Sequence, residues 1–267
     1  MPADDGDLRG VEPLAYVSHG DDRGNSTGVV LVHGAGGSAA GSWGPVAGRL
    51  AQHCRVIAPD NPGSGGTPLD GALTLDSVAD RVARTAREAG LGRFAVVGLS
   101  MGAPISLRLA TRHPGLVTGI GLIAGFAYPD ARTRLTLGLW RSLLQADPKT
   151  LGQFLLSMSF GAEYLDQLRP AERDALTAEL PGSLPPGVEA HIDLAERVDT
   201  RDDLGRIAVP AVVIGATDDT LIPVRHSEAI ARGIPESRLA RVPAGHSVPV
   251  ERPEELLALL QPLLLLT

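Results

Sequence analysis

Short, continuous apolar segments alternate with longer segments of helical periodicity along most of this chain. Apolar runs occupy residues 29–32, 55–58, 94–97, 119–124 and 211–214, and residues 14–17 form a further extended segment. Unbroken apolar character indicates strands that are buried on both faces, as a parallel sheet requires. Helical patterns occupy residues 76–89, 101–112, 224–232 and 253–261, the first with Asp76 as its expected N-cap and Gly90 as its stop. The chain is therefore predicted to be an α/β protein with a mostly parallel central sheet and flanking helices.

One stretch, residues 126–206, interrupts this alternation. Helices are expected there at residues 133–145, 151–160, 171–180 and 190–198, and the sequence PGSLPPG at 181–187 is expected to be a turn. A helical block inserted between two strands covers the carboxyl edge of a parallel sheet, where ligands bind in open α/β folds. We therefore predict a core formed by residues 1–125 and 207–267 and a helical cap over residues 126–206.

Length and composition exclude several classes of function. A chain of 267 residues falls within the range of one large α/β domain. The net charge of −7 and the aromatic content of 3% disfavour a nucleic-acid partner, because phosphates attract basic surfaces and unpaired bases stack on aromatic rings. The single cysteine, Cys54, excludes an internal disulfide and a zinc site built from cysteines. Because no cluster has metal-ligand spacing and no glycine motif fits a nucleotide, neither a metal nor a cofactor is expected.

The two ends of the sequence carry no predicted targeting or membrane segment. Residues 1–10 have acidic groups and no apolar core, so no signal peptide is expected. The leucine-rich residues 256–266 are too short to cross a bilayer and are interrupted by Pro262, which favours the buried face of a C-terminal helix. We expect a cytoplasmic monomer or homodimer that acts on a small-molecule substrate and does not bind a membrane.

Residues 98–102, with the sequence GLSMG, join the apolar run 94–97 to a helical pattern and so place Ser100 at a strand-to-helix corner. Such a corner forces the serine backbone into a strained conformation, and glycine on either side avoids clashes. Pro104 fits the first turn of the following helix, where its missing N–H has no partner to lose. Ser100 alone has two interpretations: an ordinary helix N-cap, or a nucleophile whose developing negative charge the helix N-terminus favours.

A serine nucleophile needs a base, and the base needs an acid that orients it. Two later strand-like segments end in such groups. Residues 211–215 lead to Asp218 and Asp219, and residues 239–242 lead to His246. Among the seven histidines, His246 alone follows the last strand, after a glycine that lets the loop turn inward. His246 is therefore the predicted base.

Together these motifs resemble the α/β-hydrolase superfamily, in its cap-bearing branch of esterases and lactonases. The resemblance rests on the serine corner and on the motifs at residues 32–37 (VHGAGG), 58–65 (APDNPGSG), 218–223 (DDTLIP) and 244–246 (AGH). It implies an oxyanion hole formed by the backbone N–H groups of Ala35 and Met101, and loop-holding roles for His33 and Asp60. Relatives that open epoxides or displace halide carry aspartate at the corner, so Ser100 argues against both reactions.

The resemblance leaves the triad acid ambiguous by one residue. Asp218 lies three residues after Gly215, and Asp219 lies four residues before Pro223, and both spacings occur in the family. Asp219 is preferred, because the Asp-x-x-x-Pro turn fixes which carboxylate points inward and Ala216 occupies the position of a small residue. Asp218 remains the alternative.

Apolar side chains of the inserted helices are expected to pack the cap on the core and, in part, to roof an apolar pocket for a neutral, medium-sized acyl group. They include Leu135, Leu137, Leu139, Trp140, Leu143, Phe154, Leu155, Met158, Phe160 and Tyr164. Phe126, just after the run 119–124, and Trp140 are the preferred substrate contacts. His191 could contact a polar group of the substrate, but an ordinary surface position on the cap is preferred. His226 is expected on a helix surface and His113 at a helix end, both without a catalytic role.

The predicted reaction is hydrolysis of an ester or lactone through an acyl-enzyme. Ser100 attacks the carbonyl, His246 takes its proton and Asp219 holds the imidazole. The same triad could instead serve C–C bond hydrolysis, thioester cleavage, perhydrolysis or a biosynthetic cyclisation. Outside the enzymes, the alternative is a ligand-binding protein that keeps the triad without turnover.

Overall fold

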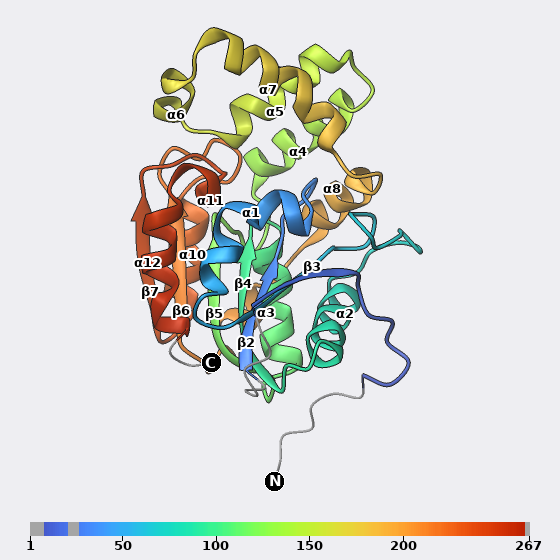
Figure 1. Ribbon diagram of the computed structural model, residues 1–267, viewed down its shortest axis with the longest axis vertical. Helices are drawn as coiled ribbons and strands as arrows, with labels where there is room; N and C mark the ends of the chain where they lie inside the picture. The colour runs from blue at the N-terminus through green and yellow to red at the C-terminus, as the bar shows by residue number, and fades with distance from the viewer. Residues whose placement is uncertain (1–7, 21–26, 265–267) are drawn as a thin grey trace.

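The computed structural model describes residues 8–20 and 27–264, which form an α/β fold (Figure 1). Its sheet has the strand order β1-β3-β2-β4-β5-β6-β7. The strands are β1 Tyr16–His19, β2 Thr27–Val32, β3 Arg55–Pro59, β4 Arg93–Leu99, β5 Val117–Ile123, β6 Ala211–Ala216 and β7 Ser237–Val242. β1 pairs antiparallel with β3, and the other neighbouring strands pair in parallel. The predicted α/β class and the mostly parallel sheet are confirmed.

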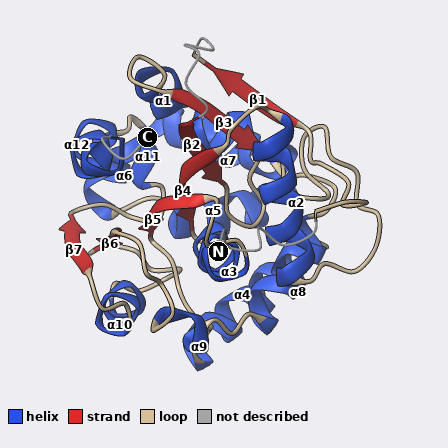
Figure 2. Cartoon of the chain, turned by 90° about the horizontal axis from the view of Figure 1, so that it is seen from below, coloured by secondary structure: helices blue, strands red, loops and turns tan. Residues whose placement is uncertain are grey.

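Alternate residues of a strand point to opposite faces of the sheet, and both faces are covered here. β2 contributes Val30 and Val32 to one layer of the core and Val29 and Leu31 to the other. The first face carries α2 (Leu75–Glu88), α3 (Gly102–Arg112) and α10 (Arg225–Gly233). The second face carries α1 (Ala39–Leu50), α11 (Val248–Glu251) and α12 (Pro253–Leu264). Figure 2 shows these two layers on either side of the strands.

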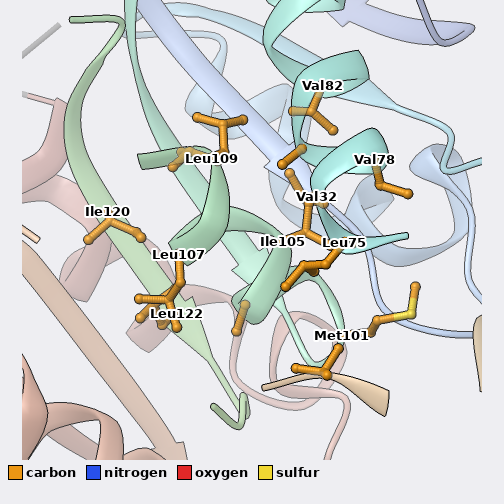
Figure 3. Packing of buried hydrophobic residues seen from close by; sticks show 14 of the residues in the cluster. Val32, Leu75, Val78, Val82, Met101, Ile105, Leu107, Leu109, Ile120 and Leu122 are labelled. Atoms are coloured by element: carbon orange, nitrogen blue, oxygen red, sulfur yellow. The ribbon is translucent and has the colours of Figure 1, made fainter. Parts of the chain in front are cut away.

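The layer on the first face positions the start of α3, which follows Ser100. Ile105 of α3 packs in one buried cluster with Val32 of β2 and Leu75 of α2 (Figure 3). All three side chains are at most 9% exposed. Because burial of each large aliphatic side chain contributes roughly 1.5–3 kcal/mol, this packing holds α3 firmly against the ends of β2 and β4.

The C-terminal leucine-rich segment forms α12, and Leu256, Leu260 and Leu263 are its buried residues, as expected. No helix within residues 8–20 and 27–264 is long and apolar enough to cross a membrane. Residues 1–7, 21–26 and 265–267 of the predicted core lie outside the described residues, and so do most of the acidic N-terminal segment and the last two leucines.

The sequence patterns did not predict α1. Three glycines and Pro45 lie within it, and these residues lower helix propensity. However, Trp43, Val46, Ala47 and Leu50 fall on one face and are buried. Packing of this face on the sheet therefore outweighs the poor local propensity.

The N-cap predicted for the helix at 76–89 is wrong. α2 begins at Leu75, and Thr74 is its N-cap, because the Thr74 side chain accepts a hydrogen bond from the Ser77 N–H. Asp76 lies within the first turn and pairs with Arg108 of α3. The predicted stop is confirmed, since α2 ends just before Gly90, which has φ +88°.

Between β5 and β6, residues 125–210 contain helices and no strand, as predicted. The helices are α4 Ala131–Leu143, α5 Pro148–Ser159, α6 Ala162–Gln167, α7 Pro170–Ser183, α8 Val188–Arg197 and α9 Arg201–Leu204. We use the name cap for α4–α8 with their connections. The cap lies over the carboxyl edge of the sheet (Figure 1). The division of the chain at residues 126 and 206 is our proposal.

The turn predicted at residues 181–187 is wrong in its first part, because α7 continues through Pro181 to Ser183. A proline inside a helix removes the N–H that would bond to the carbonyl four residues earlier, here that of Thr177. This carbonyl lies against α5, so closely that a Cβ at Gly152 would be 1.9 Å from its oxygen. α7 therefore continues through Pro181, and the Thr177 carbonyl that lacks an N–H from residue 181 lies where α7 packs closely on α5.

Candidate active site

Ser100 lies in the turn between β4 and α3 with φ +56°. Glycine on both sides is a steric requirement. A Cβ at Gly98 would lie 2.1 Å from the carbonyl oxygen of Gly102, and a Cβ at Gly102 would lie 2.1 Å from that of Val32. The N-cap of α3 is Met101, and no side chain caps this helix, so Ser100 is not an N-cap. A strained backbone of this kind is typical of functional sites, and Ser100 lines a cavity.

The loop after β2 passes directly beside Ser100. A Cβ at Gly34 would lie 2.9 Å from Cβ of Ser100 and 3.4 Å from its Oγ, so only glycine permits this approach. The backbone N–H groups of Ala35 and Met101 have no hydrogen-bond acceptor in the described part of the chain, and both residues line the same cavity as Ser100. Two unpaired amides beside a hydroxyl are suited to stabilise negative charge on a substrate oxygen.

Asp219 and His246 come from the loops after β6 and β7 and form a hydrogen-bonded pair. Nδ1 of His246 lies 2.7 Å from Oδ2 of Asp219. Because a carboxylate accepts, Nδ1–H donates, and Nε2 of the neutral ring remains an acceptor. Oδ1 of Asp219 accepts from the N–H groups of Leu221 at 2.9 Å and Ile222 at 2.8 Å. These bonds fix the carboxylate, and the carboxylate fixes the orientation of the imidazole.

Asp218, the alternative acid, has different surroundings. Its backbone N–H donates to the carbonyl of Ala244 at 3.0 Å, and the residue is exposed. The Asp219 side chain is fully buried. A buried carboxylate with three hydrogen bonds keeps its position, whereas an exposed one does not constrain a neighbouring ring. The geometry favours Asp219, which the sequence pattern also favoured.

His33 is buried and holds the loop after β2. Its Nδ1–H donates to the carbonyl of Gly34 at 2.8 Å, and its Nε2 accepts from the N–H of Asn61 at 2.9 Å. Burial lowers the pKa of His33 to about 4, so the ring is neutral near pH 7 and keeps this tautomer. The resemblance implied this loop-holding role, and the contacts agree with it.

Asp60 joins the loops after β2 and β3 by accepting two backbone hydrogen bonds. Oδ1 accepts from the N–H of Ala39 at 2.8 Å, and Oδ2 accepts from the N–H of Gly66 at 3.1 Å. Ala39 is the first residue of α1, so the carboxylate also lies at a helix N-terminus, where negative charge is favoured. The implied loop-holding role of Asp60 agrees with these contacts.

A cavity of about 330 Å³ lies between the cap and the carboxyl edge of the sheet. Ser100 and His246 line it, and so do Phe126 and Trp140, the predicted substrate contacts. Further cap side chains in its wall are Leu137, Phe154, Leu155, Met158, Phe160 and Leu184. Among the described residues that line the cavity, none is Asp, Glu, Lys or Arg. The site is therefore suited to an uncharged, mostly apolar ligand.

Two of the apolar cap residues predicted from the sequence do not pack inward. Leu135 and Leu139 of α4 are 76% and 52% exposed. They lie one helical turn apart on the solvent face of α4, whereas Leu137 and Trp140 lie on its buried face. Tyr164 stacks on Phe160, with 4.7 Å between ring centroids, and is not among the described residues that line the cavity.

The surface positions predicted for two histidines are wrong. His191 is fully buried, because it shares the inward face of α8 with Val188, Ile192 and Ala195. His226 is 6% exposed, and its Nε2 lies 3.3 Å from Oδ2 of Asp130, so it packs under the start of α4. The spacing of apolar residues in α8 was a sequence signal that could have indicated the burial of His191.

Glu251 is a further site residue that no sequence motif indicated. Its carboxylate accepts from the N–H of Gly245 at 3.0 Å and from the N–H of Gly161 at 3.2 Å. Burial raises the pKa of Glu251. The N–H of Ser247 also donates to the carbonyl of Ser159 at 2.8 Å. The loop that carries His246 is thus joined to the connection between α5 and α6 of the cap.

This combination of sheet, serine corner and capped cavity has counterparts among known proteins. The sequence profile of the Alpha/beta hydrolase family matches residues 29–259. The chain belongs to the α/β-hydrolase family. The match includes most of β2, the serine corner, the cap and the loop of His246, and with its relatives it shows that this α/β hydrolase is a hydrolytic enzyme.

Three relatives indicate the range of similarity of this α/β hydrolase. A pyrrolizixenacetamide deacetylase of Xenorhabdus hominickii is 29% identical over 245 residues, which cover 91% of this chain and 92% of the relative. A protein of Rhizobium rhizogenes named as a carbamate hydrolase, RutD, is 31% identical over 251 residues, covering 91% and 94%. The enol-lactonase structure from Burkholderia xenovorans LB400 matches with a TM-score of 0.82 and 23% identity, covering 94% of this chain and 96% of that chain. At this identity the structural match concerns the fold alone.

Proposed function

We propose that this α/β hydrolase is a serine hydrolase that cleaves a neutral ester or lactone through an acyl-enzyme intermediate. The observation that carries the proposal is the hydrogen bond of 2.7 Å between His246 and Asp219, with His246 lining the same cavity as Ser100. Ser100 is the proposed nucleophile, His246 the general base and Asp219 the acid that orients it. The backbone amides of Ala35 and Met101 are the proposed oxyanion donors.

In the acylation step, Oγ of Ser100 attacks the carbonyl carbon of the substrate while its proton passes to Nε2 of His246. Negative charge develops on the carbonyl oxygen, where the Ala35 and Met101 N–H groups stabilise it. One such donor is worth roughly 3 kcal/mol of transition-state stabilisation. Asp219 stabilises the imidazolium. His246 then gives its proton to the leaving oxygen as the C–O bond breaks.

In the deacylation step, water attacks the acyl carbon and His246 again accepts the proton. The acid product leaves with the carbonyl oxygen and the oxygen of water, and Ser100 regains its proton from His246. In both steps His246 carries the proton, and the Ala35 and Met101 N–H groups stabilise the negative charge. No cofactor takes part in the proposed reaction.

The lining of the cavity supports a neutral acyl group of medium size. A substrate carboxylate buried there would meet no lysine or arginine among the described lining residues, and an unpaired buried charge is strongly unfavourable. Phe126 and Trp140 are the proposed apolar contacts. The same reasoning disfavours a carbamate in its anionic form, although a relative is named as a carbamate hydrolase.

The deacetylase relative favours one further candidate, hydrolysis of an acetylated amine. The acyl-enzyme would be the same, and His246 would protonate an amine instead of an alcohol. Thioester cleavage, C–C bond hydrolysis, perhydrolysis and cyclisation remain alternatives for the same residues. A substrate panel separates these reactions.

Hydrolysis of nitrophenyl esters, from acetate to octanoate, tests the proposal. We expect turnover by the wild type and none above background by Ser100→Ala, because the variant lacks the attacking oxygen. A fluorophosphonate probe should label the wild type at Ser100 and leave the variant unlabelled. Equal turnover by both proteins would contradict the proposal. Lactones, thioesters, acetamides and diketones then distinguish the alternative reactions. Binding of these compounds without turnover of any of them would favour the hypothesis of a non-catalytic ligand-binding protein.

A further inference from the structure

Helix α8 of the cap is seated on the core loops that follow β2 and β3. At the N-terminal end of α8, the Gly187 N–H donates to the carbonyl of Gly63 at 2.9 Å. The two glycines approach so closely that a Cβ at Gly63 would lie 2.6 Å from Cα of Gly187. One turn further along α8, His191 is buried against the same region of the core. The cap and the core therefore share direct contacts along this part of α8.

His191 hydrogen-bonds to the loop after β2 and to the loop after β3. Its Nε2–H donates to the carbonyl of Pro62 at 2.8 Å, and its Nδ1 accepts from the N–H of Gly36 at 3.2 Å. The partners fix the tautomer, because a carbonyl can only accept and an N–H can only donate. Burial lowers the pKa of His191, so the ring stays neutral near pH 7 and keeps its acceptor at Nδ1.

The bond from Gly36 holds one of the two peptide groups that flank Ala35. The Gly36 N–H belongs to the peptide group after Ala35, and the Ala35 N–H belongs to the peptide group before it. The carbonyl of that preceding group, from Gly34, accepts from Nδ1–H of His33 at 2.8 Å. Trp140 of α4 also packs on Gly36, where a Cβ would lie 2.9 Å from two of its ring carbons. A core histidine and a cap histidine thus fix the backbone on either side of Ala35.

We propose that His191 is a positioning residue for the oxyanion-stabilising amide of Ala35, so that the full catalytic rate requires α8 to be seated on the loop after β2. This inference rests on the proposed function. His191 is not among the described residues that line the cavity, so it acts through Gly36 and not on the substrate. A small rotation of the backbone moves the Ala35 N–H relative to the substrate oxygen, and this matters most when charge develops on that oxygen. Loss of the contact should therefore lower kcat more than it changes KM.

Two substitutions separate the two hydrogen bonds of His191. The side-chain amide of asparagine reaches about as far as Nδ1, so His191→Asn can still accept from Gly36 but loses Pro62. The amide of glutamine reaches about as far as Nε2, so His191→Gln can still donate to Pro62 but loses Gly36. We expect kcat for a nitrophenyl ester to stay near the wild-type value in the asparagine variant and to fall roughly 10- to 100-fold in the glutamine variant, with similar KM values.

Arg197→Met is the matched control, because Arg197 also lies on α8 and donates to the carbonyl of Leu73 without contacting the loop after β2. This variant should keep both kcat and KM. The reverse order for the two His191 variants, or equal kcat in both, would overturn the proposal. His191→Phe removes both bonds and should be as slow as the glutamine variant, but the asparagine–glutamine pair decides even where the phenylalanine variant does not fold.

The failure of the proposed function has a different signature. Turnover by the wild type that disappears in Ser100→Ala must be seen before the His191 variants are compared. A trifluoromethyl ketone, whose serine adduct carries an oxyanion, gives a second measure that does not depend on the leaving group. Its affinity should fall in His191→Gln in parallel with kcat/KM. Unchanged affinity in that variant would contradict the positioning role of His191 and would leave the proposed function intact.

Discussion

Asp218 and Asp219 are neighbours in sequence, but their carboxylates have opposite surroundings. The Asp219 side chain is buried and hydrogen-bonds to His246, whereas Asp218 is exposed. In Asp219→Asn, an amide nitrogen can replace Oδ2 beside the ring, donate to Nδ1 and so select the tautomer that protonates Nε2. A protonated Nε2 cannot accept the proton of Ser100. We expect kcat to fall by about 10⁴-fold, measured by steady-state ester hydrolysis.

Asp218→Asn is the control for this prediction, because it makes the same chemical change one residue away. It should leave kcat nearly unchanged and should unfold at nearly the wild-type temperature. A large loss of rate in Asp218→Asn together with normal turnover in Asp219→Asn would move the role of the acid to Asp218. Thermal unfolding of both variants shows whether a loss of rate reflects a loss of structure.

At the residue scale, a side chain could be predicted from the sequence where a local motif determines its placement. Ser100 and His246 are such residues, since each follows a strand and is flanked by small residues that allow a sharp turn. His191 and Glu251 could not be assigned in this way. Their partners, Gly36 and Gly161, lie far away in the sequence, and only the docking of the cap brings them together.

At the element scale, the serine corner depends on the absence of a side chain at Gly102. A Cβ there would lie 2.1 Å from the carbonyl oxygen of Val32, and backbone on both sides cannot give way. We expect Gly102→Ala to lower the free energy of unfolding by about 3 kcal/mol or more. Urea-induced unfolding, followed by circular dichroism, measures the difference.

Gly48→Ala is the contrasting variant, because Gly48 lies inside α1 and a Cβ there would meet nothing within 4 Å. Alanine loses less conformational entropy than glycine on entering a helix, so this change should raise the free energy of unfolding by roughly 0.5–1 kcal/mol. Equal effects of the two alanine substitutions would show that the close approach at Gly102 is not what requires glycine.

Helices could be predicted where their own sequence favours them, and they were missed where packing alone stabilises them. α2 and α3 have clear apolar periodicity, and the sequence predicts both helices. The N-cap of α2 is the exception, because the sequence favours Asp76 and the structure has Thr74. α1 contains three glycines and a proline, and its apolar face is stabilised by the sheet. The continuation of α7 through Pro181 could not be predicted from the local sequence, because the close contact of α7 with α5 depends on how the two helices approach each other.

At the scale of the whole molecule, the order of strands and crossovers determined most of the architecture. Unbroken apolar runs separated by helical segments leave few arrangements besides a parallel sheet covered on both faces. The position of the cap over the carboxyl edge follows from the same topology. The depth and lining of the cavity do not follow from the topology. Leu135 and Leu137 lie on the same helix, and only the rotation of α4 about its axis makes Leu137 buried and Leu135 exposed.

Buried neutral histidines make the stability of the whole molecule depend on pH. Burial lowers the pKa of His33 from 6.5 to about 4, and the pKa of His191 is lowered in the same direction. Between pH 6.5 and 4 these two residues therefore bind more protons in the unfolded chain than in the folded one, so their contribution to stability is complete above pH 6.5 and is lost as the pH decreases. For His33 alone, the loss by pH 4 is about 3 kcal/mol. Glu251, whose pKa burial raises, acts in the opposite direction.

Urea unfolding at intervals between pH 7.5 and 4 tests this dependence, with His33→Asn as the comparison. The asparagine amide can still donate to the Gly34 carbonyl in place of Nδ1, but the variant loses the bond between Nε2 and the Asn61 N–H, so it should be less stable than the wild type at pH 7. It has no imidazole to protonate at this position, so its stability should decline less steeply between pH 6.5 and 4. The relevant quantity is the slope and not the absolute stability. Parallel slopes for the two proteins would mean that another group accounts for the loss of stability in acid, because protonation of His33 is the term that the variant removes.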